Sequence, residues 1–554
     1  MVLFASRSRS TLLVCLILSG LAPTGCRVVA LRKGEAAAPQ TFEPRGKRRV
    51  VMYYDPQGLW YPALGQGDPK AAKWLKDPEN WKKALETLVH AHVEAKVDTI
   101  VHCLFSRFET NMPPGITRVA QPIYEQVHYT RPLENMEKAG YDLVQIMLDQ
   151  AHKDGLTFIA GMRMNDRHGH AYQTHVHNGV EHTAKMYHDH PEWHLKAVPG
   201  GFDYSKEGVR AKVLAFVKDV IDHYDVDGIE YDWLRWIFIF PQGTEQRNAP
   251  LLTDFHRRTR KLLDEAGKRR GRRLLLGVRV PDSLAECADY GYAVEDWIRQ
   301  GLVDYVVPSG FGHMDFNVRV EDFRTLTEST DCRVYPSLNL WPGGRCRIKT
   351  WRPEHYYAAA HNYYGFGADG IATYNYGAGT MEQRVVKLLD LTPISDPDVL
   401  ARQYRDYYFW RRPPGRRITK SPGEVPHYDV MHLSRPVGIY GFESRGAFDF
   451  RLAEDLTKGD VSAVLEFKAV GIVESDVFDV ALNGWEVAPE RIKRFEIWDG
   501  KNWQGEDEPY ELFRIQLEPG DVVRGDNEFA VSLRPQAGKG SVRIEELNIK
   551  VHPR

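Results

Sequence analysis

The chain has 554 residues, of which 43% are hydrophobic and 27% charged; this composition excludes a disordered, collagen-like or multi-span membrane protein. Lys and Arg number 73 against 75 for Asp and Glu, so the formal charge of −2 provides no overall basic field for binding nucleic acid. Six cysteines are too few for a disulfide scaffold.

Residues 1–30 have the pattern of an export signal. Arg7 and Arg9 precede an apolar run over residues 11–22, which is shorter than the ~20 residues of a spanning helix. A basic start before a short apolar stretch is typical of a secretory signal. Gly25-Cys26 also offers a lipoprotein processing site, with a lipid anchor to the membrane through Cys26. We expect a periplasmic, outer-surface or extracellular protein; an uncleaved membrane anchor is the alternative.

Residues 47–390 alternate β-rich runs with helical patterns. The eight β-rich runs are 49–55, 97–105, 157–165, 226–233, 273–280, 303–308, 333–340 and 369–375, and the clearest helical patterns are 79–95, 142–154, 208–224, 251–267 and 353–366. Eight strands separated by helices predict an α/β fold, a (β/α)8 TIM barrel. The alternative is an open doubly wound sheet, although no Gly-x-Gly-x-x-Gly turn follows the first run.

The rest of the chain predicts a second domain of a different kind. Residues 391–430 are rich in proline and arginine and indicate a linker. Residues 431–554 contain short alternating runs and the turn signal Asn483-Gly484, which predict a C-terminal all-β sandwich. We expect this domain to brace the barrel, with glycan binding as the alternative.

The fourth β-rich run contains two carboxylates with the spacing of a strand. In Asp227-Gly-Ile-Glu-Tyr-Asp-Trp-Leu-Arg235, Glu230 and Asp232 share one face because side chains alternate along a strand. The apolar side chains on the other face suit the helix layer, so the two carboxylates are predicted to point into the barrel. At different depths their pKa values would differ, as acid/base chemistry on an acetal requires. The structural alternative is a buried Glu230 paired with Arg279 or Arg163.

Polar side chains at the other strand ends extend this candidate site, because barrel enzymes carry their reacting groups there. The candidate catalytic residues are Asp232, Glu230 and Asp166. The candidate substrate-binding residues are Asp55, His102, Arg163, Asn165, His168, Arg235, Trp236, Arg279, Asp282, Trp341, Asn375 and Tyr376. The aromatic members could stack on the apolar faces of sugar rings.

Three of these strand motifs resemble one family. Residues 224–235, Met162-Arg-Met-Asn-Asp166 and Leu276-Gly-Val-Arg-Val-Pro281 are similar to motifs of the glycosyl hydrolase-like family 10 barrels, which are exported bacterial proteins. The resemblance spans roughly residues 48–390 and implies a sugar-active barrel with Asp232 as the best-placed carboxylate. The fourth run also resembles the chitinase pattern, but Leu234 occupies the position of the catalytic glutamate there, which disfavours chitinase-type chemistry.

Eight histidines between His168 and His194 form the remaining unusual feature. Pairs spaced His-x-His can bind a transition metal, but none of these spacings is a zinc signature, so we expect neither a metal nor another cofactor. The sequence therefore predicts an exported glycoside hydrolase acting on an oligo- or polysaccharide. The alternatives are a non-catalytic glycan-binding protein and a metal-dependent hydrolase that uses this histidine-rich loop.

Overall fold

The structure is a computed structural model. It describes residues 45, 48–54, 77–105, 139–165, 176–177, 180–181, 189–198, 200–234, 236–310, 314–339, 351–374, 388, 390–409, 431–434, 445–502, 504–534 and 540–554. The chain divides into residues 1–40 and 41–554, and every described residue lies in the second unit. Among the described residues, no helix combines the length and apolar character needed to cross a bilayer.

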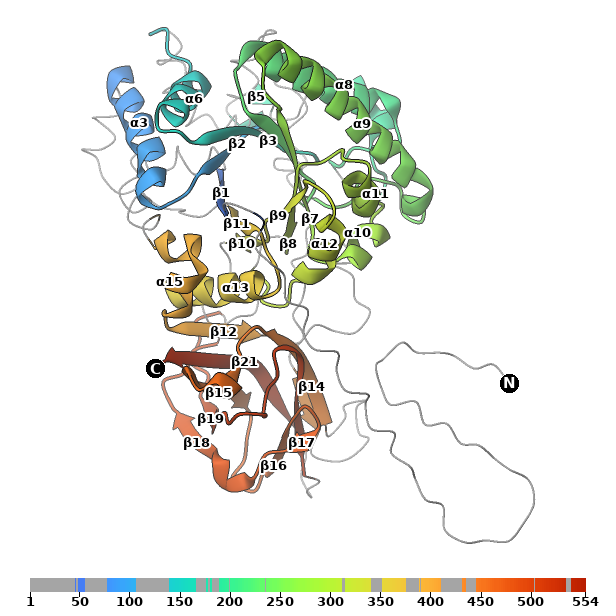
Figure 1. Cartoon of the computed structure of the whole chain (residues 1–554). Coiled ribbons are helices and arrows are strands. Elements are labelled where there is room, and N and C mark those ends of the chain that lie inside the picture. The colour runs from blue at the N-terminus through green and yellow to red at the C-terminus, as the bar shows by residue number, and fades with distance from the viewer. Residues whose placement is uncertain are drawn as a thin grey trace. The chain divides into compact units, whose positions relative to one another are not determined.

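Parallel strands form a closed ring in the first part of this unit, with helices on its outside (Figure 1). The strands are β1 (Arg49–Tyr54), β2 (Thr99–Phe105), β3 (Thr157–Arg163), β6 (Gly228–Asp232), β7 (Leu275–Pro281), β8 (Tyr305–Ser309), β9 (Arg333–Val334), β10 (Ser337–Asn339) and β11 (Gly370–Tyr374). The helices are α3 (Pro78–Glu94), α6 (Leu143–Lys153), α8 (Glu207–His223), α9 (Glu245–Arg270), α10 (Leu284–Asp289), α11 (Val294–Arg299), α12 (Val320–Thr327) and α13 (Pro353–Gly365).

The ring closes through a strand that is broken in two. β9 pairs with β8, and β10 pairs with β11, which pairs with β1. Between the two pieces, the Tyr335 amide donates to the Val306 carbonyl at 2.9 Å, and the Ala372 amide donates to the Pro336 carbonyl at 3.0 Å. Proline lacks the amide of a regular ladder, which explains the break. The predicted TIM barrel is therefore confirmed, and an open sheet is excluded.

Two apolar clusters follow from the alternation of side chains along the strands. The interior cluster contains Val51, Tyr53, Val101, Cys103, Ile159, Tyr305, Val307, Tyr335, Ala372 and Tyr374. The larger cluster lies between the strands and the helices and contains, for example, Ile100, Ile229 and Tyr231. Ile229 and Tyr231 thus face the helix layer as predicted, and Glu230 and Asp232 face the interior.

Helix starts carry ordinary capping signals. The Asp77 side chain accepts the Glu79 amide at 3.0 Å and Pro78 occupies the first turn of α3, while Asp142 accepts the Val144 amide at 2.9 Å before α6. Such caps satisfy donors that the helix leaves unpaired. They place both helices within one residue of the predicted ranges.

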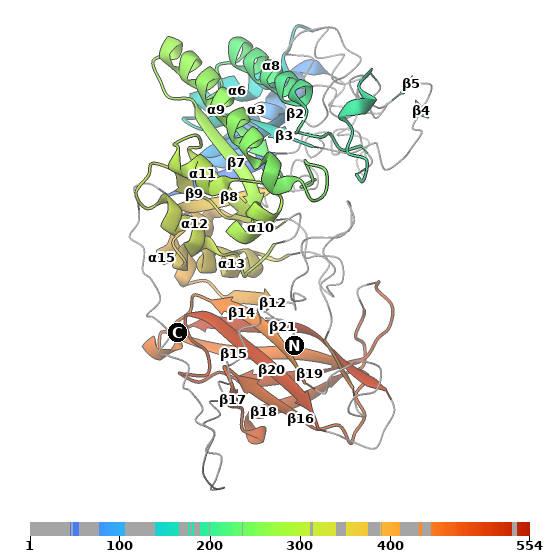
Figure 2. The same cartoon turned by 90° about the vertical axis from the view of Figure 1, so that its right-hand side faces the viewer.

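The second part of the unit is a two-sheet β-sandwich, as predicted (Figure 2). Its strands are β12 (Arg405–Phe409), β13 (Met431–Ser434), β14 (Arg445–Leu452), β15 (Val461–Val470), β16 (Phe478–Leu482), β17 (Trp485–Glu486), β18 (Ile492–Ile497), β19 (Tyr510–Gln516), β20 (Gly525–Leu533) and β21 (Ser541–Pro553). Aromatic rings pack between the sheets; the ring centroids of Phe467 and Phe529, for example, are 5.2 Å apart. Asn483 and Gly484 have φ values of 52° and 83°, which fit the predicted tight hairpin turn.

The structure differs from the sequence prediction within residues 391–409, which were assigned to the linker. This segment contains η3 (Thr392–Ser395), α15 (Pro397–Ala401) and β12, which pairs with β21 of the sandwich. Its prolines lie in the first turns of η3 and α15, where a missing amide costs nothing. All five β12 residues are buried, so β12 is part of the folded domain. Residues 410–430 lie outside the described residues.

Candidate active site

Polar side chains from several strands meet at the carboxyl end of the barrel interior. Arg163, Asp232 and Arg279 are neighbours in the ladder across β3, β6 and β7. Asn339 and Tyr374 are neighbours across β10 and β11. All five side chains are buried, and they occupy the end of the barrel where TIM-barrel enzymes hold their active sites. The predicted convergence of strand-end residues is thus observed for these positions.

Asp232 and Arg279 form the central ion pair of this group. Nη1 of Arg279 lies 2.8 Å from Oδ1 of Asp232, and the two side chains are 1% and 0% exposed. Oδ1 also accepts the Leu234 amide at 3.1 Å. Within the part of the chain that the structure describes, Oδ2 is buried and has no hydrogen-bond partner. The two oxygens of this carboxylate therefore differ: Oδ1 is held in place by two donors, and Oδ2 has no partner among the described residues.

Arg279 uses its whole guanidinium group to connect three strands. Nε and Nη2 donate to the Ser309 hydroxyl at 3.2 and 3.1 Å, and Nη2 also donates to the Gly310 carbonyl at 3.1 Å. Nδ2 of Asn339 donates to the same hydroxyl at 3.1 Å. The Tyr374 ring lies against the guanidinium, 3.7 Å from its central carbon, in a cation–π contact. These contacts fix the orientation in which Arg279 meets Asp232.

Glu230 lies one layer deeper than Asp232, as the strand alternation predicts. Its Oε2 accepts the Tyr305 hydroxyl at 2.9 Å. Burial, with the Asp232 charge adding to it, raises the pKa of Glu230 to about 8 against the lowering effects of the Tyr305 hydrogen bond and Arg279. Glu230 therefore holds a proton at neutral pH. The alternative interpretation paired Glu230 with Arg163 or Arg279, whereas the described contact of its carboxyl group is with Tyr305.

A missing side chain makes room for Tyr305. A Cβ placed on Gly277 of β7 would lie 2.0 Å from Cζ of the Tyr305 ring, so only glycine permits the ring to cross β7. The tyrosine hydroxyl thereby reaches Glu230 on β6. Sequence analysis had no signal for this pairing, because it depends on which strands are neighbours and on the depth of each side chain.

Tyr53 on β1 is a member of the site that the sequence analysis missed. Its ring stacks on Tyr374 with 4.8 Å between centroids, and among the described residues its buried hydroxyl has no hydrogen-bond partner. Burial raises the pKa of Tyr53 well above its ordinary value; Cys103 and Asp232 add to the rise, while Arg163 opposes it. The phenol is therefore neutral and close enough to interact with Asp232. The alternation of Val51 and Tyr53 could have identified it.

Two other predicted binding residues, Asn165 and His102, have different surroundings. The Asn165 amide donates to the carbonyls of Phe238 at 2.8 Å and Phe202 at 3.3 Å, and its Oδ1 accepts the Phe202 amide at 2.9 Å. It therefore holds two loops together. His102 alternates with the interior residues Val101 and Cys103 and lies 6.1 Å from the Phe158 ring, so the structure does not bring it into the group.

Asp282 and Trp236 lie just beyond strand ends. Asp282 is buried, and its backbone carbonyl accepts the Arg319 amide at 3.3 Å. Trp236 is half-buried with φ of 125°, a conformation that costs energy for any residue other than glycine.

The remaining predictions fall outside the described residues. They are Asp55, Asp166, His168, Arg235, Trp341, Asn375 and Tyr376, together with most of the histidine-rich loop. Within the described ranges, no group of three or more His, Cys, Asp or Glu side chains could hold a metal ion. His190 is described: its Nδ1 lies 3.0 Å from Oε1 of Glu192, and its ring stacks on Trp193 at 3.7 Å.

Comparison with protein-family models gives no match, and comparison with curated proteins gives none. Membership of glycosyl hydrolase-like family 10 therefore stays a prediction. Among solved structures, the chain is similar to α-L-fucosidase isoenzyme 2 from Paenibacillus thiaminolyticus, with 10% identity, coverage of 65% of this chain and 51% of that chain, and a TM-score of 0.40.

Two further structures give comparable scores. For the PgaB (BpsB) glycoside hydrolase domain from Bordetella bronchiseptica, the identity is 10%, the coverage 63% of this chain and 98% of that chain, and the TM-score 0.37. For the noncanonic maltogenic α-amylase AmyB from Thermotoga neapolitana, the identity is 12%, the coverage 86% of this chain and 98% of that chain, and the TM-score 0.36.

Proposed function

We propose that this protein is an exported glycoside hydrolase that cleaves an oligo- or polysaccharide at the carboxyl end of its barrel. The observation that carries the proposal is the pair of carboxyl groups on β6. Glu230 is buried, bonded to Tyr305 and protonated at neutral pH, while Asp232 is paired with Arg279 and has one oxygen without a partner among the described residues. Acetal hydrolysis uses two carboxyl groups in such contrasting environments.

The surroundings suggest a role for each group. Asp232 would present Oδ2 to the anomeric carbon as nucleophile, or to an attacking water as base. The proton for the leaving oxygen would come from Glu230 or from Asp166, between which the choice stays open. Arg163 and Arg279 lie beside Tyr374, with their guanidinium carbons 5.8 and 3.7 Å from the ring centroid, and they make an anionic glycan a suitable substrate.

The test is a panel of neutral and anionic glycans, with the release of reducing ends as the measurement. We expect wild type to cleave at least one glycan and Asp232→Asn to lose that activity. Asp227→Asn is a matched control, because Asp227 precedes the same strand at its opposite end and its Oδ2 accepts the Phe158 amide at 2.8 Å. Equal cleavage by wild type and Asp232→Asn would overturn the catalytic assignment.

One observation favours a second candidate, a non-catalytic glycan-binding protein. Asp232 is fully buried against Arg279, and a buried ion pair of this kind can serve architecture alone. This candidate predicts that wild type binds a glycan without releasing reducing ends, and that Asp232→Asn retains the binding. A metal-dependent hydrolase would require the histidine-rich loop, and metal analysis of the purified protein with and without chelator would identify it.

A further inference from the structure

The loop between β8 and α12 links the candidate active site to the sandwich. It follows Ser309 and Gly310, which hold Arg279, and its residues 314–319 are described. Barrel residues contact it on one side: the Tyr363 hydroxyl donates to the Asp315 carbonyl at 2.6 Å, and Nδ2 of Asn362 donates to the Phe316 carbonyl at 3.1 Å. Both donors belong to α13.

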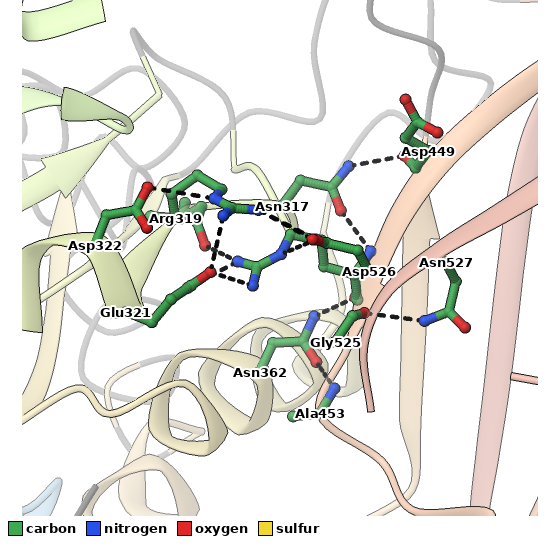
Figure 3. Close-up of polar contacts among 12 residues, drawn as sticks. Asn317, Arg319, Glu321, Asp322, Asn362, Asp449, Ala453, Gly525, Asp526 and Asn527 are labelled. Carbon is green, nitrogen blue, oxygen red and sulfur yellow. Dashed lines mark hydrogen bonds and ion pairs between the residues drawn. The ribbon is translucent and has the colours of Figure 1, made fainter. Parts of the chain in front are cut away.

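The sandwich bonds the other side of the same loop (Figure 3). Oδ1 of Asn317 accepts the Arg451 amide at 2.9 Å, and its Nδ2 donates to the Asp449 carbonyl at 3.3 Å. The Asn317 side chain thus bonds the backbone of β14 much as a neighbouring strand would. In addition, Nη1 of Arg319 lies 3.2 Å from Oδ1 of Asp526 on β20. Two sandwich strands therefore take part in holding this loop.

Arg451 is the central residue of the contact. Its Nη1 donates to the Val318 carbonyl and to Glu321 Oε2, both at 3.0 Å, and its Nε donates to Asp526 Oδ1 at 2.8 Å. The guanidinium also lies over the Phe366 ring, 4.2 Å from the centroid, and the Arg451 side chain is only 9% exposed. One side chain from β14 thus joins a loop carbonyl, the start of α12 and a second sandwich strand.

Asn362 closes the same network from the barrel. Besides the Phe316 carbonyl, its Nδ2 donates to the Arg451 carbonyl at 2.8 Å, and its Oδ1 accepts the Ala453 amide at 2.8 Å. Asn362 is fully buried. Because Asn317, the Val318 carbonyl and Arg319 each have a partner on the sandwich, the loop position depends on the sandwich and not on the barrel alone.

We propose that the sandwich is a positioning element of the active site and that Arg451 is a positioning residue, acting through residues 314–319 of the β8–α12 loop on the backbone of Asp282, and thereby on Arg279 at the end of the same strand. The contact between this loop and β7 is a backbone hydrogen bond, in which the Arg319 amide donates to the Asp282 carbonyl at 3.3 Å. The effect on turnover rests on the proposed hydrolase function, whereas the effect on the loop does not.

The test compares full-length Arg451→Gln with full-length Arg445→Gln. Arg445 lies on the same strand, and its Nη2 lies 3.2 Å from Glu528 Oε1 within the sandwich, so its loss removes an ion pair without touching the loop. Amide hydrogen exchange over residues 314–327 is the first measurement. We expect exchange about tenfold or more faster in Arg451→Gln than in Arg445→Gln, because charge-assisted bonds to the loop are lost.

Kinetics supply the second measurement. On a glycan that wild type cleaves, and well below the melting midpoint, we expect Arg451→Gln to lower kcat about tenfold with little change in KM, because orientation and not binding is impaired. Asn317→Ala is a second variant that removes the bonds to β14 without leaving a buried charge, and we expect the same direction of change.

The outcomes separate the two proposals. Unchanged exchange in both Arg451→Gln and Asn317→Ala would overturn the positioning role, whatever the activity. Faster exchange with unchanged kcat and KM would show that the loop does not act on the site, which also overturns the inference but leaves the hydrolase proposal standing. If wild type cleaves no glycan, the hydrolase proposal fails, and the exchange experiment still decides whether the sandwich holds the loop.

Discussion

The buried carboxyl of Glu230 makes the stability of the barrel depend on pH in a way that one substitution should reveal. Its pKa is raised from 4.5 to about 8, so the folded state keeps a proton that the unfolded chain releases above pH 4.5. The stability provided by this group is fully present below pH 4.5 and is lost as the pH rises towards 8. At roughly 1.36 kcal/mol per pH unit, the loss between pH 5 and pH 8 is on the order of 4 kcal/mol.

Glu230→Gln removes this titration and keeps the shape of the protonated acid, including an oxygen that can accept the Tyr305 hydroxyl. The free energy of unfolding of Glu230→Gln minus that of wild type should therefore increase between pH 5 and pH 8. Urea denaturation followed by tryptophan fluorescence can measure it, because Trp81, Trp233 and Trp297 are buried in the barrel.

A matched control comes from Glu466, a buried glutamate whose pKa is lowered in the folded protein, whereas that of Glu230 is raised. Lys550 and Arg514 lower the pKa of Glu466, against the effect of burial. Glu466 is therefore ionised in both the folded and the unfolded state between pH 5.5 and 8. Burial, together with the Glu466 charge, raises the pKa of Asp406 to about 6, so the stability difference between Glu466→Gln and wild type should be independent of pH only above the Asp406 titration, from about pH 7 to 8. If the Glu230→Gln difference were also flat, Glu230 would be ionised in the folded barrel and the proposed division of roles would be refuted.

Three further substitutions probe the barrel interior around Glu230 and Asp232. Arg279→Met should lower the free energy of unfolding by about 3–5 kcal/mol, because Asp232 would be buried without its charge partner; a loss below about 1 kcal/mol in urea denaturation would contradict the pairing. Gly277→Ala should destabilise the barrel by about 1–3 kcal/mol or more through the clash with Tyr305, measured as a lower melting midpoint, and an unchanged midpoint would speak against the packing. Tyr53→Phe should leave stability unchanged or slightly raised, because it removes a buried hydroxyl without a partner among the described residues, yet lower hydrolysis; lost stability with full activity would assign Tyr53 to packing.

The sequence was sufficient for the fold because its strongest signals are local and periodic. All eight β-rich runs are strands of the barrel, and α13 begins at the predicted Pro353. The predicted element boundaries were wrong where a local sequence signal is compatible with two different structures. Prolines at 393 and 397 resemble linker residues, but they begin a 3-10 helix and an α-helix. Pro250 lies inside α9, which starts six residues before the predicted position 251.

The candidate site was predictable in part for a related reason. Alternation along β6 placed Glu230 and Asp232 on the interior face, and strand ends identified Arg163 and Arg279. The hydrogen-bond partners of these side chains could not be assigned, because they depend on which strands are neighbours and on how deep each side chain lies in the barrel. Glu230, for example, bonds the hydroxyl of Tyr305, whose ring passes over Gly277 of the strand between them. A polar residue near a strand end also need not face the interior, as His102 illustrates.

Arg279 explains why the site and the sandwich form one connected structure. Its planar guanidinium donates to Asp232, Ser309 and Gly310 at once and stacks on Tyr374. A lysine ammonium could not satisfy these directions together, because it lacks the rigid fork and the flat face. Asp282, three residues after Arg279, accepts the amide of Arg319 in the loop that β14 bonds, so displacement of that loop would disturb the strand end that carries Arg279. The geometry of the Asp232 carboxylate, at the centre of the barrel, therefore depends on contacts made by the C-terminal domain.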